Sequence, residues 1–330
     1  MKILILRMSA FGDIIMASGI LPPIKKAYPD STIFWMTQKE YEPLLSNSPY
    51  IDQIIPINRK KIEMAFKKRK IGEFVTLVKR YIKELRQYNF DLVLDLQGIW
   101  KSGVWAFFSR SRKKIVVDPK EGCGFLYTKK IISNPQDKKI GAEYKLILKH
   151  LGISDKEYGF GLGEVPDVLN LKEKYVVFCP FTTRPQKFWI DNYWKELQQG
   201  FKQKGFKIAV LGGKGDIKRF TKIFSDDSKM INLVGKLDIL ESLGVIKHSS
   251  GVVGVDTGLT HAAMLFNKRV VAIFGSTCPY FDTGYEAGKV LYKKLPCSPC
   301  KRNPTCDNKF TCMKNISPQQ VLDAFFEISS

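Results

Sequence analysis

The sequence has no long hydrophobic run. No stretch reaches the roughly 18 uninterrupted apolar residues that a membrane-spanning helix needs. The opening residues, MKILILRMSAFGD, are apolar only in short pieces, which Arg7 and Asp13 interrupt, and they do not resemble a secretory signal. These absences predict a cytoplasmic protein that is not embedded in a membrane, and they leave peripheral contact with a membrane open.

Acidic residues are scarce relative to basic ones. The chain has 53 Lys and Arg against 32 Asp and Glu, a formal net charge of +21. Such an excess favours a polyanionic partner, which could be a nucleic acid, an anionic membrane face or a phosphorylated substrate. Hydrophobic residues make up 44% of the 330, so wholesale disorder is excluded and about two domains are expected.

Cysteine is thinly spread except near the C-terminus. Four of the seven cysteines follow a C-x2-C-x5-C-x5-C spacing, at Cys297, Cys300, Cys306 and Cys312. In a cytoplasmic protein such a cluster suggests a structural metal site before a disulfide framework. The spacing matches no zinc signature, so a set of reduced thiols without a metal is an equal alternative.

Short runs rich in Ile, Val, Leu and Phe alternate with helical patterns along the whole chain. In the clearest helix, 73–87, apolar residues recur on one face, and the other face is charged. The alternation is most regular from a strand at 175–179 to a strand at 270–274. Continuous apolar strands between amphipathic helices indicate parallel sheets that are covered on both faces.

A linker candidate divides this pattern into two halves. The segment 158–167, YGFGLGEVPD, holds three glycines and a proline. The sequence therefore predicts an α/β protein with two Rossmann-like domains, 1–165 and 166–330. A final helix that opens at Ser317, a capping residue followed by proline, closes the second domain.

Neither common phosphate-binding motif follows the first strand candidate, 2–7. The next residues, RMSAFGD, contain no G-x-G-x-x-G and no G-x-x-x-x-G-K-[ST]. Instead Gly12 precedes Asp13 at a helix start, where the helix dipole favours an aspartate. The alternative is that Asp13 is a catalytic carboxylate displayed at the end of the strand.

Three loops in the second half follow strand candidates and suit an anionic ligand, which doubly wound sheets bind beyond the carboxyl ends of their strands. PFTTRPQKFW (180–189) offers hydroxyls and positive charges, and GGKGD (212–216) offers glycines and a carboxylate for ribose hydroxyls. GVDTGLTHAA (254–263) offers the N–H groups of a helix start. A solvated loop, a turn and a helix capped by Asp256 or Thr257 are the structural alternatives. Their coincidence at successive strand ends favours one anionic ligand.

The motifs RMSAFGD, TTRPQK and VDTGLTH occur in the order and spacing typical of the heptosyltransferases, glycosyltransferase family nine, which the chain resembles over nearly its whole length. CSPC and the closing SPQQV helix extend the resemblance. It implies a GT-B fold, in which two Rossmann-like domains face each other across a cleft. It also implies an inverting, metal-independent transfer of heptose from ADP-heptose, without a cofactor. The acceptor would be the inner core of bacterial lipopolysaccharide (Kdo-lipid A or a heptosylated core), reached from the cytoplasmic face of the inner membrane.

The resemblance also implies roles for single residues. Asp13 matches the general base, and Lys187 matches a catalytic residue that contacts the donor phosphates. Asp256 matches a residue that holds sugar hydroxyls, whereas Asp216 corresponds only loosely to an acidic ribose contact. The full set of donor contacts implied in this way is Thr182, Thr183, Lys187, Asp216, Asp256, Thr257, Gly258, Leu259 and His261.

In this scheme the first half would bind the acceptor. The run RKKIEMAFKKRK (59–70) has seven basic residues and one acidic residue. A charge run is most often a solvated surface. The acceptor of this family carries carboxylates and phosphates in an anionic leaflet, which favours contact with the acceptor or with the membrane. The candidate acceptor residues are Lys60, Lys61, Lys67, Lys68, Arg69 and Lys70.

Two other functions compete with this interpretation. A related glycosyltransferase that uses another nucleotide sugar, or that adds a later core heptose, would have the same loops. A nucleic-acid-binding protein would explain the charge, but helix-turn-helix, zinc-finger and RNA-binding signatures are absent, and the basic residues are not confined to one module.

Overall fold

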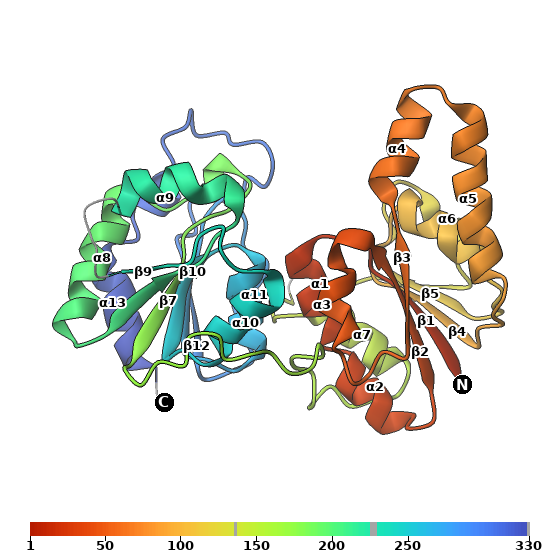
Figure 1. Ribbon diagram of the computed structural model, residues 1–330, viewed down its shortest axis with the longest axis horizontal. Helices are drawn as coiled ribbons and strands as arrows, with labels where there is room; N and C mark the ends of the chain where they lie inside the picture. Colours follow the sequence, from red (N-terminus) through yellow and green to blue (C-terminus); the bar gives the residue numbers. More distant parts are fainter. Residues whose placement is uncertain (135–136, 225–229, 329–330) are drawn as a thin grey trace. The chain divides into compact units, whose positions relative to one another are not determined.

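The computed structural model describes residues 1–134, 137–224 and 230–328, which fold into two compact units (Figure 1). The first unit comprises Met1–Asp137 and Gly141–Glu164, and the second comprises Lys138–Ile140 and Val165–Ser330. The division lies one residue before the boundary at 165 that the sequence suggests, and the short segment 138–140 belongs with the second unit. Within the described ranges, no helix has the length and apolar character needed to cross a bilayer.

The first unit is built on a six-stranded parallel sheet in the order β3-β2-β1-β4-β5-β6. Its strands are β1 (Lys2–Leu6), β2 (Thr32–Gln38), β3 (Gln53–Ile57), β4 (Leu92–Asp95), β5 (Lys114–Val117) and β6 (Lys129–Ile131). Its helices are α1 (Phe11–Ser18), α2 (Leu21–Ala27), α3 (Glu42–Ser46), α4 (Arg59–Lys67), α5 (Ile71–Leu85), α6 (Trp100–Phe108) and α7 (Ala142–His150). Residues 3–6 of the central strand β1 are fully buried, as expected for a strand covered on both faces.

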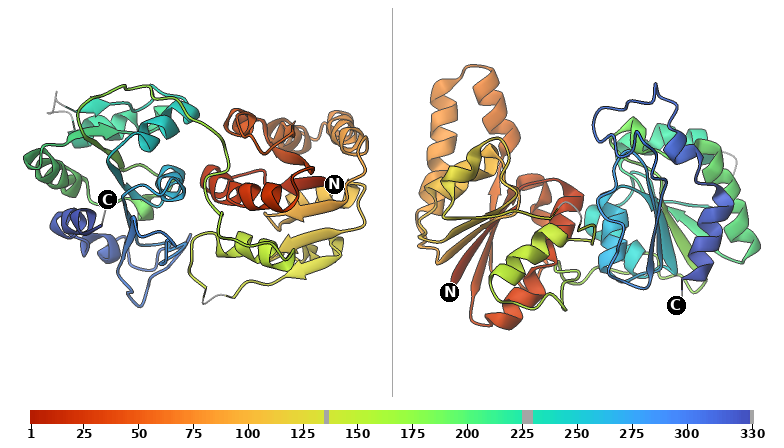
Figure 2. Two further views of the ribbon diagram at one scale, coloured as in Figure 1. Left: turned by 90° about the horizontal axis from the view of Figure 1, so that it is seen from below. Right: turned by 180° about the vertical axis from the view of Figure 1, so that it is seen from behind.

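The second unit repeats this architecture with the strand order β12-β11-β10-β7-β8-β9. The strands are β7 (Tyr175–Cys179), β8 (Lys207–Val210), β9 (Ile231–Asn232), β10 (Gly251–Val255), β11 (Val270–Phe274) and β12 (Gly288–Tyr292). The helices are α8 (Asp191–Gln203), α9 (Ile217–Phe224), α10 (Ile239–Lys247), α11 (Gly258–Leu265), α12 (Thr311–Lys314) and α13 (Pro318–Glu327). Helix α13 packs beside α8 (Figure 2), with the rings of Phe325 and Phe201 4.8 Å apart.

The predicted fold class, two Rossmann-like α/β domains, is confirmed, and the expected strands are present. Two strands, β6 and β12, were not expected. Both are edge strands, and their residues are exposed or half-buried, so they lack the continuous apolar pattern. The apolar pattern of the sequence predicts a single helix over 13–27, whereas the structure has two helices there, α1 and α2, separated at Gly19 and Ile20.

Each sheet has a switch point, where the strand order reverses and the loops that follow two adjacent strands diverge. In the first unit this point lies between β1 and β4, and in the second unit between β7 and β10. The loops after these four strands are therefore where a ligand site is expected. They contain Asp13, residues 96–98, Lys187 and the DTGLTH segment.

Candidate active site

The loops that follow β7 and β10 meet at the switch point of the second unit. Lys187, from the loop after β7, lies with its Nζ 2.7 Å from Oδ2 of Asp256, which comes directly after β10. Both side chains are largely shielded from water, with exposed fractions of 17% for Lys187 and 9% for Asp256. Two residues that sequence resemblance assigned separately to phosphate and sugar contacts thus form one buried ion pair.

Further polar groups fix the Asp256 carboxylate. The Thr277 hydroxyl donates to Oδ2, and His261 Nε2 lies 3.2 Å from Oδ1. On its other side, His261 Nδ1 is 2.9 Å from the Tyr280 hydroxyl. Because an ionised carboxylate only accepts hydrogen bonds, Nε2 carries a proton, and in the neutral ring Nδ1 accepts from Tyr280. The carboxylate is therefore oriented from both of its oxygens.

The electrostatics of this cluster favour an ionised Asp256. Burial by itself would raise the pKa of the Asp256 carboxyl. The hydrogen bond from His261 and the nearby Lys187 ammonium outweigh that effect and hold the pKa of Asp256 well below its usual range. Burial also raises the pKa of Tyr280 well above its usual value, so this hydroxyl remains a proton donor.

Helix α11 begins next to this carboxylate, and of the two cap candidates Thr257 takes the N-cap position, without a side-chain hydrogen bond. Thr257 is the N-cap residue, but no side chain in the described part of the chain accepts a hydrogen bond from the first turn. The reason is that Asp256 is engaged by Lys187, His261 and Thr277 instead. The first-turn N–H groups, from Gly258 and Leu259, thus lie beside a fixed ion pair without a side-chain cap.

The other donor-loop candidates are half-buried or exposed. Thr182 is half-buried and Thr183 is exposed, both in the loop that carries Lys187. Asp216 accepts a hydrogen bond from the Gly213 N–H (2.8 Å), so its carboxylate closes a turn, as the structural alternative proposed. No interaction of Asp216 links it to the Lys187 loop within the described residues.

Hydrogen bonds connect the cysteine segment to the residues after β11 and to the loop that carries Lys187. The Lys301 N–H donates to the Ser276 carbonyl (2.7 Å), next to the end of β11, and the Ser298 hydroxyl donates to the Gly275 carbonyl. The buried Gln186 amide donates to the Lys301 carbonyl (3.0 Å). The residue before Lys187 is therefore tied to this segment.

The four clustered cysteines, Cys297, Cys300, Cys306 and Cys312, are free thiols. In the described ranges, no group of three or more His, Cys, Asp or Glu side chains is placed to hold a metal ion. Both interpretations of this segment, a structural metal site and a set of reduced thiols, stay predictions.

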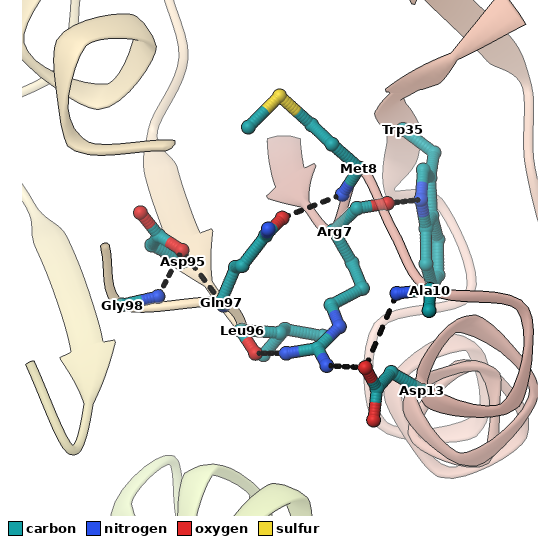
Figure 3. Close-up of polar contacts among 9 residues, drawn as sticks. All are labelled: Arg7, Met8, Ala10, Asp13, Trp35, Asp95, Leu96, Gln97 and Gly98. Carbon is teal, nitrogen blue, oxygen red and sulfur yellow. Dashed lines mark hydrogen bonds and ion pairs between the residues drawn. The ribbon is translucent and has the colours of Figure 1, made fainter. Parts of the chain in front are cut away.

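The switch point of the first unit holds Asp13 (Figure 3). Asp13 Oδ2 accepts from the Ala10 N–H (3.1 Å) and lies 2.7 Å from Nη2 of Arg7. The first contact closes the first turn of helix α1, so the expected position of Asp13 at the start of a helix is confirmed. Only Oδ2 takes part in these contacts, and the side chain is 41% exposed. Oδ1 forms no hydrogen bond with any described residue and is available to a ligand.

Arg7 is held by the loop that follows β4. Its Nη1 donates to the Leu96 carbonyl, while Gln97 Oε1 accepts from the Met8 N–H (3.0 Å), as Figure 3 shows. This loop is itself anchored by Asp95, which is fully buried and accepts from the Gln97 and Gly98 N–H groups. A chain of contacts thus runs from the core of the sheet to the exposed Asp13 carboxylate.

The basic run 59–70 folds into α4 and the turn before α5. Some of its charges are paired, because Lys60 lies 2.9 Å from Glu40 and Arg59 lies 2.8 Å from Glu63. The remaining candidates, Lys61 and the four basic residues of 67–70, are exposed, and Lys70 lies 3.8 Å from Glu73. They are on the first unit, on a different body from the Lys187 loop.

Sequence reasoning missed several residues of these clusters. The sequence gives Arg7 no role beyond interrupting an apolar run and opening the motif RMSAFGD, and Thr277 and Tyr280 lie outside every motif. Their position after a strand was the available signal, because Arg7 follows β1 and Thr277 and Tyr280 follow β11 at the same sheet edges. Which of the residues at such an edge turn toward each other depends on loop conformation, which the pattern does not encode.

Comparison with known proteins gives the family of the chain. Residues 78–310 match the model of glycosyltransferase family 9 (heptosyltransferase). Lipopolysaccharide heptosyltransferase 1 of Pseudomonas aeruginosa is 22% identical, with 97% of this chain and 96% of the relative aligned.

Two solved structures share the fold. A family 9 glycosyltransferase from Veillonella parvula has a TM-score of 0.82 at 17% identity, covering 99% of this chain and 96% of the other. The heptosyltransferase WaaC of E. coli with ADP-2-deoxy-2-fluoro heptose has a TM-score of 0.75 at 21% identity and full coverage of both chains. The family model covers well over half of the residues, and the chain belongs to glycosyltransferase family 9, the heptosyltransferases.

Proposed function

We propose that this protein transfers a heptose from ADP-heptose to an anionic, lipid-linked acceptor in lipopolysaccharide biosynthesis, at the cytoplasmic face of the inner membrane. The observation that carries the proposal is the cluster at the second switch point, where Lys187, Asp256 and the uncapped start of α11 lie together. The names of the curated relatives and the ADP-sugar bound to a structural neighbour support the choice of donor.

On the donor side, the diphosphate needs positive charge as it leaves. The Lys187 ammonium and the first-turn N–H groups at 257–259 supply it from fixed positions, which is the most effective way to stabilise developing negative charge. When a phosphate takes Lys187 as its partner, Asp256 keeps its orientation, because His261 and Thr277 still hold it. Asp256 Oδ2, which keeps the hydrogen bond from Thr277, can then accept a second one from a sugar hydroxyl in the place of Lys187.

On the acceptor side, Asp13 is the proposed general base. Its free Oδ1 takes the proton of the acceptor hydroxyl while that oxygen attacks the anomeric carbon. The new carbon–oxygen bond forms on the face opposite the diphosphate, the bond to the diphosphate breaks, and ADP leaves with inversion at the anomeric carbon. Arg7 orients the carboxylate through Oδ2 and so leaves Oδ1 toward the acceptor.

The scheme uses neither a metal ion nor a cofactor, because Lys187 and the helix start carry the charge of the leaving group. The basic residues of 59–70 would contact the carboxylates and phosphates of the acceptor. A related enzyme that uses another nucleotide sugar would share every one of these features, so the test must vary the nucleotide.

The test is a thermal-shift panel with ADP, UDP, GDP and a short oligonucleotide, followed by a transfer assay with ADP-heptose and heptose-free lipopolysaccharide precursor, with and without a chelator. We expect ADP alone to raise the melting temperature, and transfer to proceed unchanged with chelator. A shift with UDP or GDP instead would reject ADP-heptose as donor. A shift with the oligonucleotide alone would reject a glycosyltransferase function.

A further inference from the structure

Helices α4 and α5 form a hairpin that stands out from the first unit (Figure 1). Two large apolar side chains lie at its tip, Phe66 with 69% of its surface exposed and Ile71 with 73%. Met64 of α4 and Val75 of α5, which lie further from the tip, are also exposed. A cluster of exposed apolar side chains of this kind on a protruding element marks an interaction site.

The fold fixes the tip, so this exposure is not a matter of loose side chains. The turn closes through hydrogen bonds from the Arg69 N–H to the Phe66 carbonyl (3.0 Å) and from the Lys70 N–H to the Ala65 carbonyl (2.9 Å). Ala65 is buried between the helices, and the Phe66 ring leans on Phe74 of α5 at 5.5 Å. Phe66 is therefore held on the outside of the hairpin.

Positive charge surrounds these apolar side chains. Lys67, Lys68 and Arg69 fill the turn between Phe66 and Ile71, and in the described part of the chain none of them forms an ion pair. At the base of the same hairpin, by contrast, Arg59 and Lys60 are paired with acidic residues. Within this hairpin, unpaired charge and exposed apolar surface thus coincide at the tip.

We propose that the tip of this hairpin, residues 64–71, inserts into the headgroup region of an anionic phospholipid bilayer. Phe66 and Ile71 would enter the boundary with the acyl chains, while the lysine and arginine side chains reach back to lipid phosphates. A nucleic acid or a soluble anion would use the charges but leave Phe66 and Ile71 without a partner. The proposal adds a docking surface to the proposed function and does not depend on it.

The experiment is co-sedimentation of the full chain with vesicles, in the absence of any donor or acceptor. The vesicles are phosphatidylcholine alone or an equal mixture of phosphatidylcholine and phosphatidylglycerol. The test variant is Phe66→Ser with Ile71→Ser. The matched control is Phe125→Ser with Ile132→Ser, which removes the same residue types at 70% and 72% exposure elsewhere on the first unit.

We expect the wild type to bind the mixed vesicles and to bind less at high salt, where charge attraction is screened. The tip variant should lose at least about tenfold in partition coefficient, because two apolar side chains no longer leave water on binding. The control variant should bind as the wild type does. A tip variant that binds like the wild type, or a control variant that loses as much, overturns the proposal.

A second measurement tests insertion directly. Phe66→Trp should give tryptophan fluorescence that brominated lipids in mixed vesicles quench more strongly than they quench the wild type. Equal quenching would mean that the tip contacts lipid phosphates without entering the bilayer, and would overturn the insertion. Because neither measurement needs substrate, a failure here leaves the proposed transfer reaction untouched, and a failure of the transfer assay leaves this result untouched.

Discussion

Replacement of Asp13 by asparagine separates its structural contact from its proposed chemistry. In the wild type, Asp13 Oδ2 accepts from Arg7 and from the Ala10 N–H, while Oδ1 makes no such contact with any described residue. The asparagine amide oxygen can take the place of Oδ2 and keep both contacts. Its NH2 group then occupies the position of Oδ1, and that group cannot accept a proton.

The two expected effects differ in size. Turnover should fall by roughly 10²–10⁴-fold, the usual contribution of a general base, which corresponds to about 2.7–5.4 kcal/mol in the activation free energy. The stability loss should be about 1 kcal/mol or less, for two reasons. The asparagine oxygen keeps the hydrogen bond from Arg7, although residue 13 no longer carries a charge, and solvent screens a side chain that is 41% exposed. Donor affinity should not change.

The assay measures turnover at saturating substrate, the melting temperature, and the affinity for the donor by calorimetry. Asp191→Asn is the matched control, because Asp191 also lies in the first turn of a helix and pairs with an arginine, Arg219. It should cost a similar amount of stability and leave turnover unchanged. An Asp13→Asn enzyme with turnover close to that of the wild type would show that Asp13 is only a cap, and would remove the base from the mechanism.

The remaining predictions concern the donor site, the basic run and the cysteines. Lys187→Ala should weaken ADP-sugar binding by about 1.5–3 kcal/mol in calorimetry, the value of a charge-assisted hydrogen bond, and unchanged affinity would remove Lys187 from the site. Replacing the three lysines of 67–70 by glutamate should raise KM for the acceptor and leave KM for the donor unchanged, and the effect should be smaller at high salt. If both constants stay as in the wild type, the run is only a solvated surface. Cys297→Ser with Cys300→Ser should lower the melting temperature or leave it unchanged while turnover per folded molecule is retained, and lost turnover in a folded variant would give the thiols a part in the reaction.

Much of the fold could be predicted because its strands are buried on both faces. A strand such as β10 reads as an uninterrupted apolar run, and the helices between such runs show one apolar face each. Edge strands lack this signal, and β12 has no fully buried residue. The break between α1 and α2 was missed because the apolar pattern continues through Gly19 and Ile20, so periodicity alone gives one helix.

The candidate site could be located from the sequence but not assembled from it. The loops at strand ends can be identified in the sequence because each follows an apolar run, and the topology then brings the loops after β7 and β10 together. The pairing of Lys187 with Asp256 depends on side-chain directions within loops, and so does the role of Arg7. No rule based on spacing along the sequence predicts these contacts, because the two residues of each pair lie in loops and not at set positions of one helix or strand.

The segment DTGLTH shows why a helix start at a strand end can serve a ligand. A side-chain cap would have satisfied the first-turn N–H groups of α11 and lowered the free energy of the ligand-free protein. Instead Asp256 is turned away to Lys187, His261 and Thr277, and the N–H groups have no side-chain acceptor in the described structure. A diphosphate at this point would supply the missing acceptor and a second partner for Lys187. The free protein thus lacks about 1 kcal/mol of capping, and in the proposed reaction the same N–H groups would stabilise the charge that develops on the leaving group.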